Sequence, residues 1–272
     1  MVNYISSRDN PLIRLVSSLK LKKNRDKTSM FFIEGVRFVK EALDSGCRIE
    51  QLLMSQTFYQ ENEMVEEILK KGIENYVIED NLFKKISETT TPQGIMAVMK
   101  KTCFDLNKIL ENKNYNHFII IIDGVRDPGN MGTIIRTAHA AGCHGVIVFK
   151  GSVDVFNPKT LRATMGSVFN VPIVYSNSKE KTIQKIREYG ISIIAADVKG
   201  DTYPYEIDLT GPIALVVGNE TKGISSKLLS RSSSVIRIPM PGGAESLNVA
   251  MATGIIAYEV IRQRKAFLSP IL

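Results

Sequence analysis

The sequence predicts an α/β protein in which a smaller N-terminal α/β unit precedes a larger unit built on a mostly parallel sheet. Runs of Val, Ile and Phe alternate with helical patterns along the 272 residues, and such alternation is typical of sheets with helices on their faces. Several runs in the second half are apolar throughout, among them Phe-Ile-Ile-Ile-Ile at 118–122. Strands of this kind are buried on both faces, which favours a parallel sheet between two layers of helices.

The N-terminal unit is expected to span residues 1–100. Its first 30 residues predict a short amphipathic helix followed by a basic loop. After this loop, strands are expected at 31–34, 49–54, 76–78 and 95–99, and helices at 36–43, 61–71 and 81–86. The polar residues 101–116 are expected to form a linker that contains a helix near 105–110.

The C-terminal unit is expected to span residues 117–272. Its strands are predicted at 118–123, 145–149, 171–175, 191–196, 213–217 and 235–238. Helical patterns lie at 131–141, 158–165, 178–189 and 225–229, and a closing helix runs to about residue 264. In the closing helix, apolar residues recur at the spacing of one helical face, and core packing explains them: Leu247, Met251, Gly254, Tyr258 and Ile261.

Composition and charge narrow the class of protein. The 44% hydrophobic content is sufficient for a core without disulfides, and the net charge is +7. Residues 1–30 carry seven basic and two acidic side chains, as expected of an arm that contacts nucleic-acid phosphates. The three cysteines and three histidines show no metal-ligand spacing, so no metal is expected. No apolar run is long enough to span a membrane, which predicts a cytoplasmic protein.

Three predicted strands end in loops rich in polar residues and glycine, at 123–132, 217–223 and 236–249. Loops at the carboxyl ends of strands bind ligands in α/β sheets, so these three predict one composite site. Helix capping is the simpler explanation for Ser and Asn in such loops. The second loop begins like a phosphate-binding loop, but Ile224 stands where that motif requires Lys.

The same loops resemble the three motifs of the SpoU (TrmH) family of RNA ribose 2′-O-methyltransferases, in the SPOUT superfamily. The matching residues are Asn130 with Arg136, Gly-Asn-Glu-Thr-Lys-Gly at 218–223, and Ile-Pro-Met at 238–240 with Ser-Leu-Asn-Val at 246–249. The resemblance covers roughly 117–265. It implies a trefoil-knotted SPOUT domain that binds S-adenosylmethionine and a homodimer formed through the C-terminal domain. The N-terminal unit resembles the family's L30e-like substrate domain through shorter motifs at 5–11, 32–35 and 91–94.

The resemblance also implies roles for single residues. The catalytic set is Arg136, Asn130, Glu220, Ser246 and Asn248, and the cofactor-binding set is Val217, Gly218, Ile238, Met240 and Leu247. Arginine has a pKa above about 12, so we expect Arg136 to clamp an RNA phosphate rather than to act as a base. Asn130 is expected to cap its helix and to orient the ribose or Arg136. Glu220 is expected to pair with Arg136 or to accept hydrogen bonds from loop amides. Ser246 and Asn248 are expected either to form hydrogen bonds with the ribose hydroxyl or the cofactor carboxylate, or to cap the closing helix.

The family resemblance predicts ribosomal RNA as the substrate. Three alternatives remain open from the sequence. Transfer-RNA enzymes share the catalytic half, and antibiotic-resistance methylases share the two-domain layout. A non-catalytic RNA-binding or ribosome-assembly protein would use the same basic arm and N-terminal domain.

Overall fold

Two separate sheets organise the chain, one in each of two units. The computed structural model describes residues 3–111 and 116–265. The N-terminal unit comprises Met1–Thr102 together with Phe156–Phe169, and the C-terminal unit comprises Cys103–Val155 and Asn170–Leu272. The predicted boundaries at 100 and 117 stay a prediction, but the grouping of 156–169 with the N-terminal unit was not expected from the sequence.

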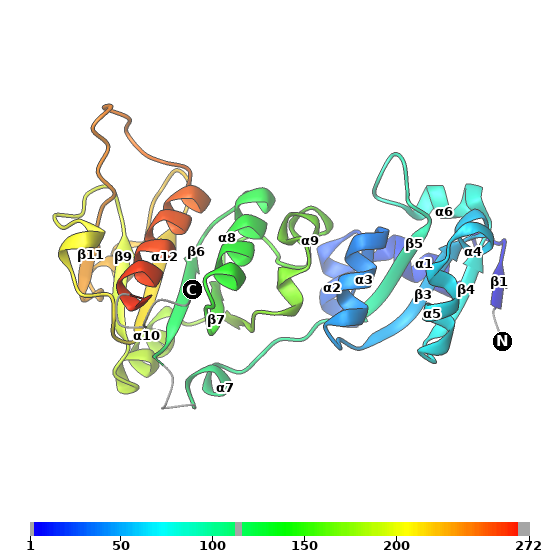
Figure 1. The fold of residues 1–272 in the computed structure, drawn as a ribbon, viewed down its shortest axis with the longest axis horizontal. Coiled ribbons are helices and arrows are strands. Elements are labelled where there is room, and N and C mark those ends of the chain that lie inside the picture. Colours follow the sequence, from blue (N-terminus) through cyan, green and yellow to red (C-terminus); the bar gives the residue numbers. More distant parts are fainter. Residues whose placement is uncertain (1–2, 112–115, 266–272) are drawn as a thin grey trace. The chain divides into compact units, whose positions relative to one another are not determined.

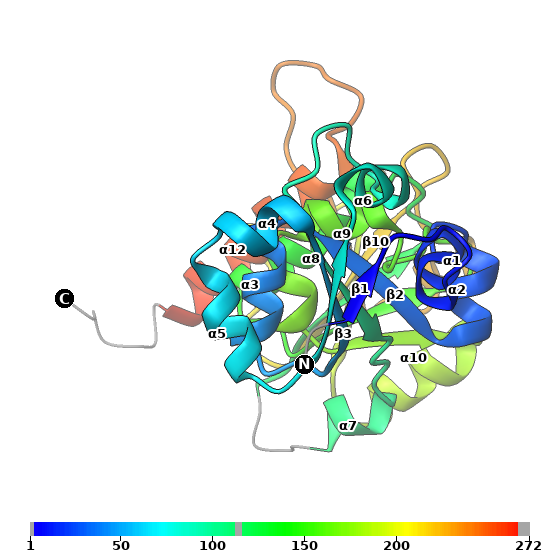
Figure 2. The ribbon, with the colours of Figure 1, turned by 90° about the vertical axis from the view of Figure 1, so that its right-hand side faces the viewer.

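The N-terminal unit contains a mixed five-stranded sheet of order β1-β4-β3-β5-β2. Its strands are β1 (Asn3–Ile5), β2 (Met30–Glu34), β3 (Ile49–Ser55), β4 (Glu74–Ile78) and β5 (Ile95–Lys100). Its helices are α1 (Pro11–Ser18), α2 (Lys22–Thr28), α3 (Val36–Asp44), α4 (Gln56–Glu61), α5 (Met64–Lys70), α6 (Asp80–Ile86) and α9 (Pro158–Thr164). Helices α3, α4 and α5 lie on one side of this sheet, and α1 and α2 lie on the other (Figure 2).

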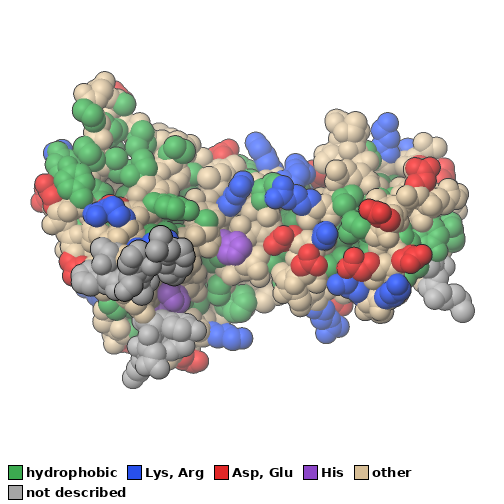
Figure 3. Space-filling view, viewed as in Figure 1, with side chains coloured by type: hydrophobic (Ala, Val, Ile, Leu, Met, Phe, Trp, Pro, Cys, Tyr) green, Lys and Arg blue, Asp and Glu red, His purple; other side chains and the backbone are tan. Residues whose placement is uncertain are grey.

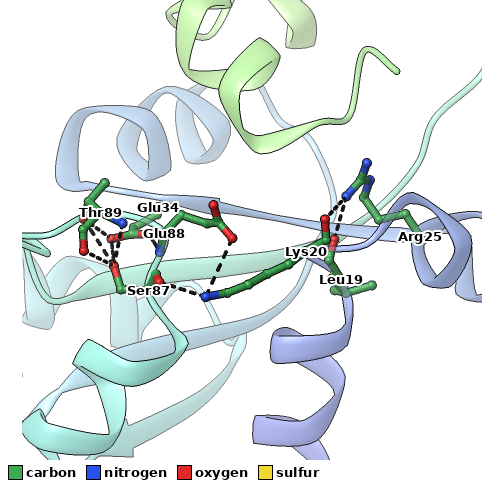
Figure 4. A network of polar contacts seen from close by, with 7 residues as sticks. All are labelled: Leu19, Lys20, Arg25, Glu34, Ser87, Glu88 and Thr89. Atoms are coloured by element: carbon green, nitrogen blue, oxygen red, sulfur yellow. Dashed lines mark hydrogen bonds and ion pairs between the residues drawn. The ribbon is translucent and has the colours of Figure 1, made fainter. Parts of the chain in front are cut away.

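The basic run after α1 is a helix, α2, and not the loop that was predicted. Arg25 of α2 is only 2% exposed, because its guanidinium donates hydrogen bonds of 2.8 Å to the carbonyls of Leu19 and Lys20 at the end of α1 (Figure 4). In the same network, Glu34 accepts hydrogen bonds from the Glu88 amide at 2.9 Å and from the Thr89 hydroxyl at 2.5 Å. One of the seven basic residues is therefore structural and not available to phosphate.

The C-terminal unit contains a six-stranded sheet of order β11-β9-β10-β6-β7-β8, in which every neighbouring pair is parallel within the described residues. Its strands are β6 (Phe118–Asp123), β7 (Gly145–Phe149), β8 (Ile173–Ser176), β9 (Ser192–Ala196), β10 (Ile213–Gly218) and β11 (Ser234–Ile236). The apolar runs at β6, β7 and β10 are buried along their whole length. This confirms the parallel, doubly covered sheet that the sequence predicted.

Helices cover both faces of this sheet (Figure 1). They are α7 (Leu106–Leu110), α8 (Pro128–Ala140), α10 (Lys179–Glu188), α11 (Ser226–Leu229) and α12 (Val249–Lys265). Residues of α7, α10 and α11 share one apolar cluster with strand residues such as Ile121 and Val216. Helices α8 and α12 pack against each other. No helix among the described residues is long and apolar enough to cross a membrane.

The apolar stripe predicted for the core side of α12 faces outward instead. Met251 and Tyr258 are 61% and 57% exposed, and Ile255 beside them is 44% exposed. The buried face of α12 carries smaller side chains on average: Ala250, Thr253, Ile256, Ala257 and Val260. The strand order does not by itself establish a trefoil knot, so the knot stays an inference from the resemblance.

Candidate active site

A cavity of about 500 Å³ lies at the carboxyl ends of β9, β10 and β11 and under the loop that leads into α12. Parallel pairing brings these strand ends to one edge of the sheet, because Gly218 is level with Asp123 and Ile236 is level with Ala196. The lining mixes apolar side chains such as Ile236, Ile238 and Leu247 with polar ones such as Glu220 and Asn248. The second and third of the predicted loops therefore do form one composite site.

Gly218 ends β10 at a point where the chain folds back on itself. The amide of Asn219 donates to the Gly223 carbonyl at 3.0 Å, and the Gly223 amide donates to the Asn219 carbonyl at 2.9 Å. A Cβ at Gly218 would lie 2.4 Å from the Gly223 carbonyl carbon and the Ile224 nitrogen. Glycine is required here to fit the tight loop, and the same loop forms a wall of the cavity.

Asn130, Glu220 and Asn248 form a hydrogen-bonded chain that joins the three loops. The side-chain Nδ2 of Asn130 donates to Glu220 Oε1 at 3.0 Å, and the side-chain Nδ2 of Asn248 donates to Asn130 Oδ1 at 2.8 Å. Glu220 also accepts hydrogen bonds of 3.1 Å from the backbone amides of Arg126 and Asp127. Burial raises the pKa of Glu220, but the hydrogen bonds from Asn130 and from these amides outweigh it, so this pKa lies below its usual range.

Of the two predictions for Glu220, the bond to loop amides is the one that the structure contains. Among the described residues, none forms a hydrogen bond or ion pair with the Arg136 side chain, which is exposed on α8 while Ile134 and Ile135 are buried. Arg136 therefore lies off the buried face, as its position in the helical pattern predicted. It does not line the cavity.

The capping predictions were correct for one asparagine and wrong for the other. Asp127 caps α8, because its carboxylate accepts a hydrogen bond of 2.8 Å from the backbone amide of Asn130. Asn130 itself lies within the first turn of the helix. The prediction that Asn130 caps this helix is wrong because α8 begins at Pro128, three residues earlier than expected. Asn248 caps α12 by accepting from the amides of Ala250 and Met251 at 2.9 and 3.2 Å.

The remaining predicted residues divide into two groups. Ile238, Met240, Ser246 and Leu247 line the cavity from the β11–α12 loop. The side chain of Ser246 forms no hydrogen bond with the described residues, so it does not cap α12. Val217 is 1% exposed within β10 and does not line the cavity.

Sequence reasoning missed the contribution of β9. Ala196, Asp197 and Val198 line the cavity next to the β10 loop. The signal was present in the sequence, since Asp-Val-Lys-Gly at 197–200 follows an apolar strand just as the three chosen loops do. Asn219 was also missed: it donates to the Gly124 carbonyl at 2.7 Å and so ties the β10 loop to the β6 loop.

The described residues contain no cluster of three or more His, Cys, Asp or Glu side chains placed to hold a metal ion.

Comparison with known proteins finds one family model for each unit. Residues 117–258 match the profile of the SpoU rRNA Methylase family, and residues 10–97 match the MRM3-like substrate binding domain. The 23S rRNA (guanosine(2553)-2′-O)-methyltransferase RlmP of Bacillus subtilis is 35% identical, over 95% of this chain and 99% of its own.

Two solved structures extend this likeness to the fold. The AdoMet-bound rRNA methyltransferase from Sinorhizobium meliloti is 34% identical with a TM-score of 0.86, covering 98% of this chain and 99% of its own. The SpoU methyltransferase AviRb from Streptomyces viridochromogenes, in complex with AdoMet, is 30% identical with a TM-score of 0.87. The match covers 94% of this chain and 98% of the AviRb chain.

Proposed function

The chain belongs to the SpoU rRNA methylase family, and we propose that it transfers a methyl group from S-adenosylmethionine to a ribose 2′-hydroxyl of ribosomal RNA. The observation that carries the proposal is the cavity whose walls are tied by Asn130, Glu220 and Asn248 to the base of α8, the helix that presents Arg136. One hydrogen-bonded network thus supports both the proposed cofactor pocket and the helix that carries the proposed substrate residue.

The cavity suits the cofactor in size and in chemistry. Its volume of about 500 Å³ lies within the range of about 300–1,000 Å³ that is usual for small-molecule sites. Ile236, Ile238 and Leu247 line the cavity with apolar residues suited to an adenine ring, and Gly218 and Met240 also line it. We propose that backbone groups of Gly218 and Met240 bind the edge of this ring. When bound, S-adenosylmethionine supplies an electrophilic methyl group.

At the substrate end, we propose that Arg136 binds the phosphate beside the target ribose and stabilises the developing negative charge of the 2′-oxygen. No described residue forms a hydrogen bond or ion pair with the Arg136 side chain, so the guanidinium donors are available for RNA. The hydrogen bonds among Asn130, Glu220 and Asn248 would hold the first turn of α8 in one orientation, and with it Arg136 on the same helix. In this proposal water is excluded from the pocket during the transfer. Ser246 is placed in this proposal as a donor to the cofactor or the ribose.

The proposal includes a homodimer through the C-terminal unit. Met251, Ile255 and Tyr258 form an exposed apolar face on α12, and hydrophobic side chains gather on the part of this unit where α12 and the loop before it lie (Figure 3). Surfaces of this kind are typical of interfaces. A cytoplasmic location and RNA binding by the N-terminal unit complete the proposal.

The test is incubation of the protein with labelled S-adenosylmethionine and unmodified total RNA, followed by fractionation of the RNA by size. Recovery of label in ribosomal RNA as a 2′-O-methyl nucleoside supports the proposal. Label confined to transfer RNA would keep the chemistry and change the substrate. No label in free RNA or in ribosomal subunits, together with no cofactor binding, would favour a non-catalytic RNA-binding protein.

A further inference from the structure

Asp197 lines the cavity from the side away from Arg136. In the sheet, β9 and β6 lie on opposite sides of β10. Asp197 follows β9, while Asn130 and Arg136 belong to the segment after β6. A ligand that fills the cavity and presents its reactive group toward α8 would therefore have a different part of its structure next to Asp197.

The Asp197 side chain is held in place, yet one of its oxygens accepts no hydrogen bond from the residues that the structure describes. Oδ1 accepts the Lys199 amide at 3.0 Å, which fixes the carboxylate in its turn. Oδ2 faces Gly223, where an added Cβ would lie 3.2 Å from it, and Gly223 has a φ of +68°. Among the described residues, no Lys or Arg forms an ion pair with Asp197. The turn therefore presents a fixed, half-buried anion to the cavity.

S-adenosylmethionine offers three kinds of group to a carboxylate: a sulfonium, an ammonium and a ribose diol. A carboxylate next to the sulfonium would stabilise the charged ground state more than the transition state and would slow the transfer. The sulfonium must also lie near the Arg136 end, because the methyl group reacts there. A vicinal diol presents two hydroxyl donors to a carboxylate, as ribose does to an acidic residue after a strand in other α/β folds.

We propose that Asp197 binds the ribose hydroxyls of S-adenosylmethionine and so determines cofactor affinity rather than the rate of methyl transfer. This inference rests on the proposed function. It adds a binding residue outside the three sequence motifs, and it gives Gly223 a second reason to be glycine, since a side chain there would crowd the carboxylate.

The test compares the wild type with Asp197→Asn, in which Oδ1 still accepts the Lys199 amide. Two probes are titrated: S-adenosylhomocysteine, and 5′-methylthioadenosine, which has the same ribose but no ammonium group. We expect both dissociation constants to rise by a similar factor of about 10 to 100, as for loss of a hydrogen bond to a charged group. In the transfer assay, KM for the cofactor should rise while kcat stays within about twofold.

The matched control is Asp201→Asn, which removes the same charge from an exposed neighbour that bonds only to Thr202 in the described structure. It should leave both constants unchanged. Weakening of S-adenosylhomocysteine alone would overturn the proposal and assign Asp197 to the ammonium group, and unchanged binding of both probes would overturn it outright. Failure of the wild type to bind either probe would instead reject the proposed function itself.

Discussion

At the scale of single residues, substitution of Arg136 should lower the rate of methyl transfer without changing the affinity for the cofactor. Its side chain lies outside the cavity and forms no bond with the described residues. We therefore expect Arg136→Ala to lower kcat by about 100- to 1,000-fold, the usual cost of losing a group that stabilises developing charge. Cofactor affinity, measured by calorimetry, should stay the same. The control Lys181→Ala removes a positive charge from an exposed position of α10. An equal loss of binding and rate in Arg136→Ala would contradict the assignment.

The Glu220 carboxylate should make part of the stability dependent on pH. Because its pKa is lowered in the folded protein, the ionised form is favoured by folding, and this contribution is present above the usual glutamate pKa of about 4.3. It is lost as the pH falls through the lowered value. The melting temperature of Glu220→Gln should therefore lie below that of the wild type at pH 7, and the difference should shrink below about pH 4.3.

The control for this titration is Glu63→Gln, since the Glu63 side chain has no hydrogen bond among the described residues. Its melting temperature should follow that of the wild type throughout. A constant difference between Glu220→Gln and the wild type from pH 7 downward would show that the ionised form is not favoured by folding.

Gly218 and Gly211 offer a direct test of the tight loop, since Gly218 ends β10 and Gly211 lies two residues before this strand begins. A Cβ at Gly218 would collide with backbone atoms, whereas a Cβ at Gly211 has no atom within 4 Å. Gly218→Ala should lower the free energy of unfolding by about 1–3 kcal/mol and weaken cofactor binding. Gly211→Ala should leave both unchanged in chemical denaturation and binding measurements; equal effects would refute the steric argument.

Single-residue roles were predictable where local spacing decides them. The exposure of Arg136 follows from the helical period around Ile134 and Ile135, and the sequence predicted it. The partner of Glu220 depends on which loops meet in space, so the sequence left two possibilities. Asp197 was missed because β9 had no recognised motif, although its strand-then-turn pattern is the same as that of the other loops.

At the scale of elements, α12 is apolar on two faces, and this explains why its orientation was predicted wrongly. Periodicity shows that a stripe exists but not which side the sheet occupies. The sheet side carries Ala250, Thr253 and Ala257, which allow close packing, and the larger Met251 and Tyr258 face outward. The helix predicted at 61–71 corresponds to α5 (Met64–Lys70). The helix before it, α4, was not predicted, and it ends where Asn62 takes an extended conformation.

The exposed face of α12 yields a test of the dimer. Ile255→Glu places a charge in the middle of this face, so we expect sedimentation to show a monomer where the wild type is a dimer. The unfolding transition of the separated subunit should remain cooperative, since Ile255 is outside the core. Leu69→Glu, a comparably exposed leucine at 38% on α5, should leave the mass unchanged. A monomeric wild type at micromolar concentration would remove the dimer from the proposal.

At the scale of the whole molecule, Arg264 in the last turn of α12 connects this helix to the start of two strands of the C-terminal unit. Its guanidinium donates to the carbonyls of Asn116, His117 and Gly211 at 2.9, 3.0 and 2.7 Å. These carbonyls lie at the amino ends of β6 and β10, the sheet edge away from the cavity. Helix α12 is thus fixed at both ends, by Asn248 at the cavity and by Arg264 at the opposite edge.

Arg264→Ala should lower the free energy of unfolding by about 2–3 kcal/mol, because the carbonyls that accept hydrogen bonds from the charged guanidinium would lose their donor. The control lies two residues away: the exposed Arg262 side chain pairs with Glu259 at 2.7 Å, and ion pairs of a surface arginine contribute about 0–1 kcal/mol. Denaturant titration of both variants measures the difference. Similar values for the two variants would show that the hydrogen bonds of Arg264 to these carbonyls do not stabilise the C-terminal unit.

The two-unit α/β architecture was predictable because alternating strands and helices are local patterns. The return of 156–169 to the N-terminal unit was not, because it depends on contacts between distant segments, such as the ring of Phe156, whose centroid lies 4.7 Å from that of Phe31. The sequence contains no composition change at either end of that segment that would mark it.

This return has a consequence for recombination between relatives. The chain passes from one unit to the other after Thr102, after Val155 and again after Phe169, so no single junction separates them. A chimaera that takes residues 1–102 from another family member would set a foreign β2 against the native α9 and Phe156. Exchange of substrate-binding halves therefore requires both segments from the same parent, and natural or laboratory crossovers near residue 102 alone should be poorly tolerated.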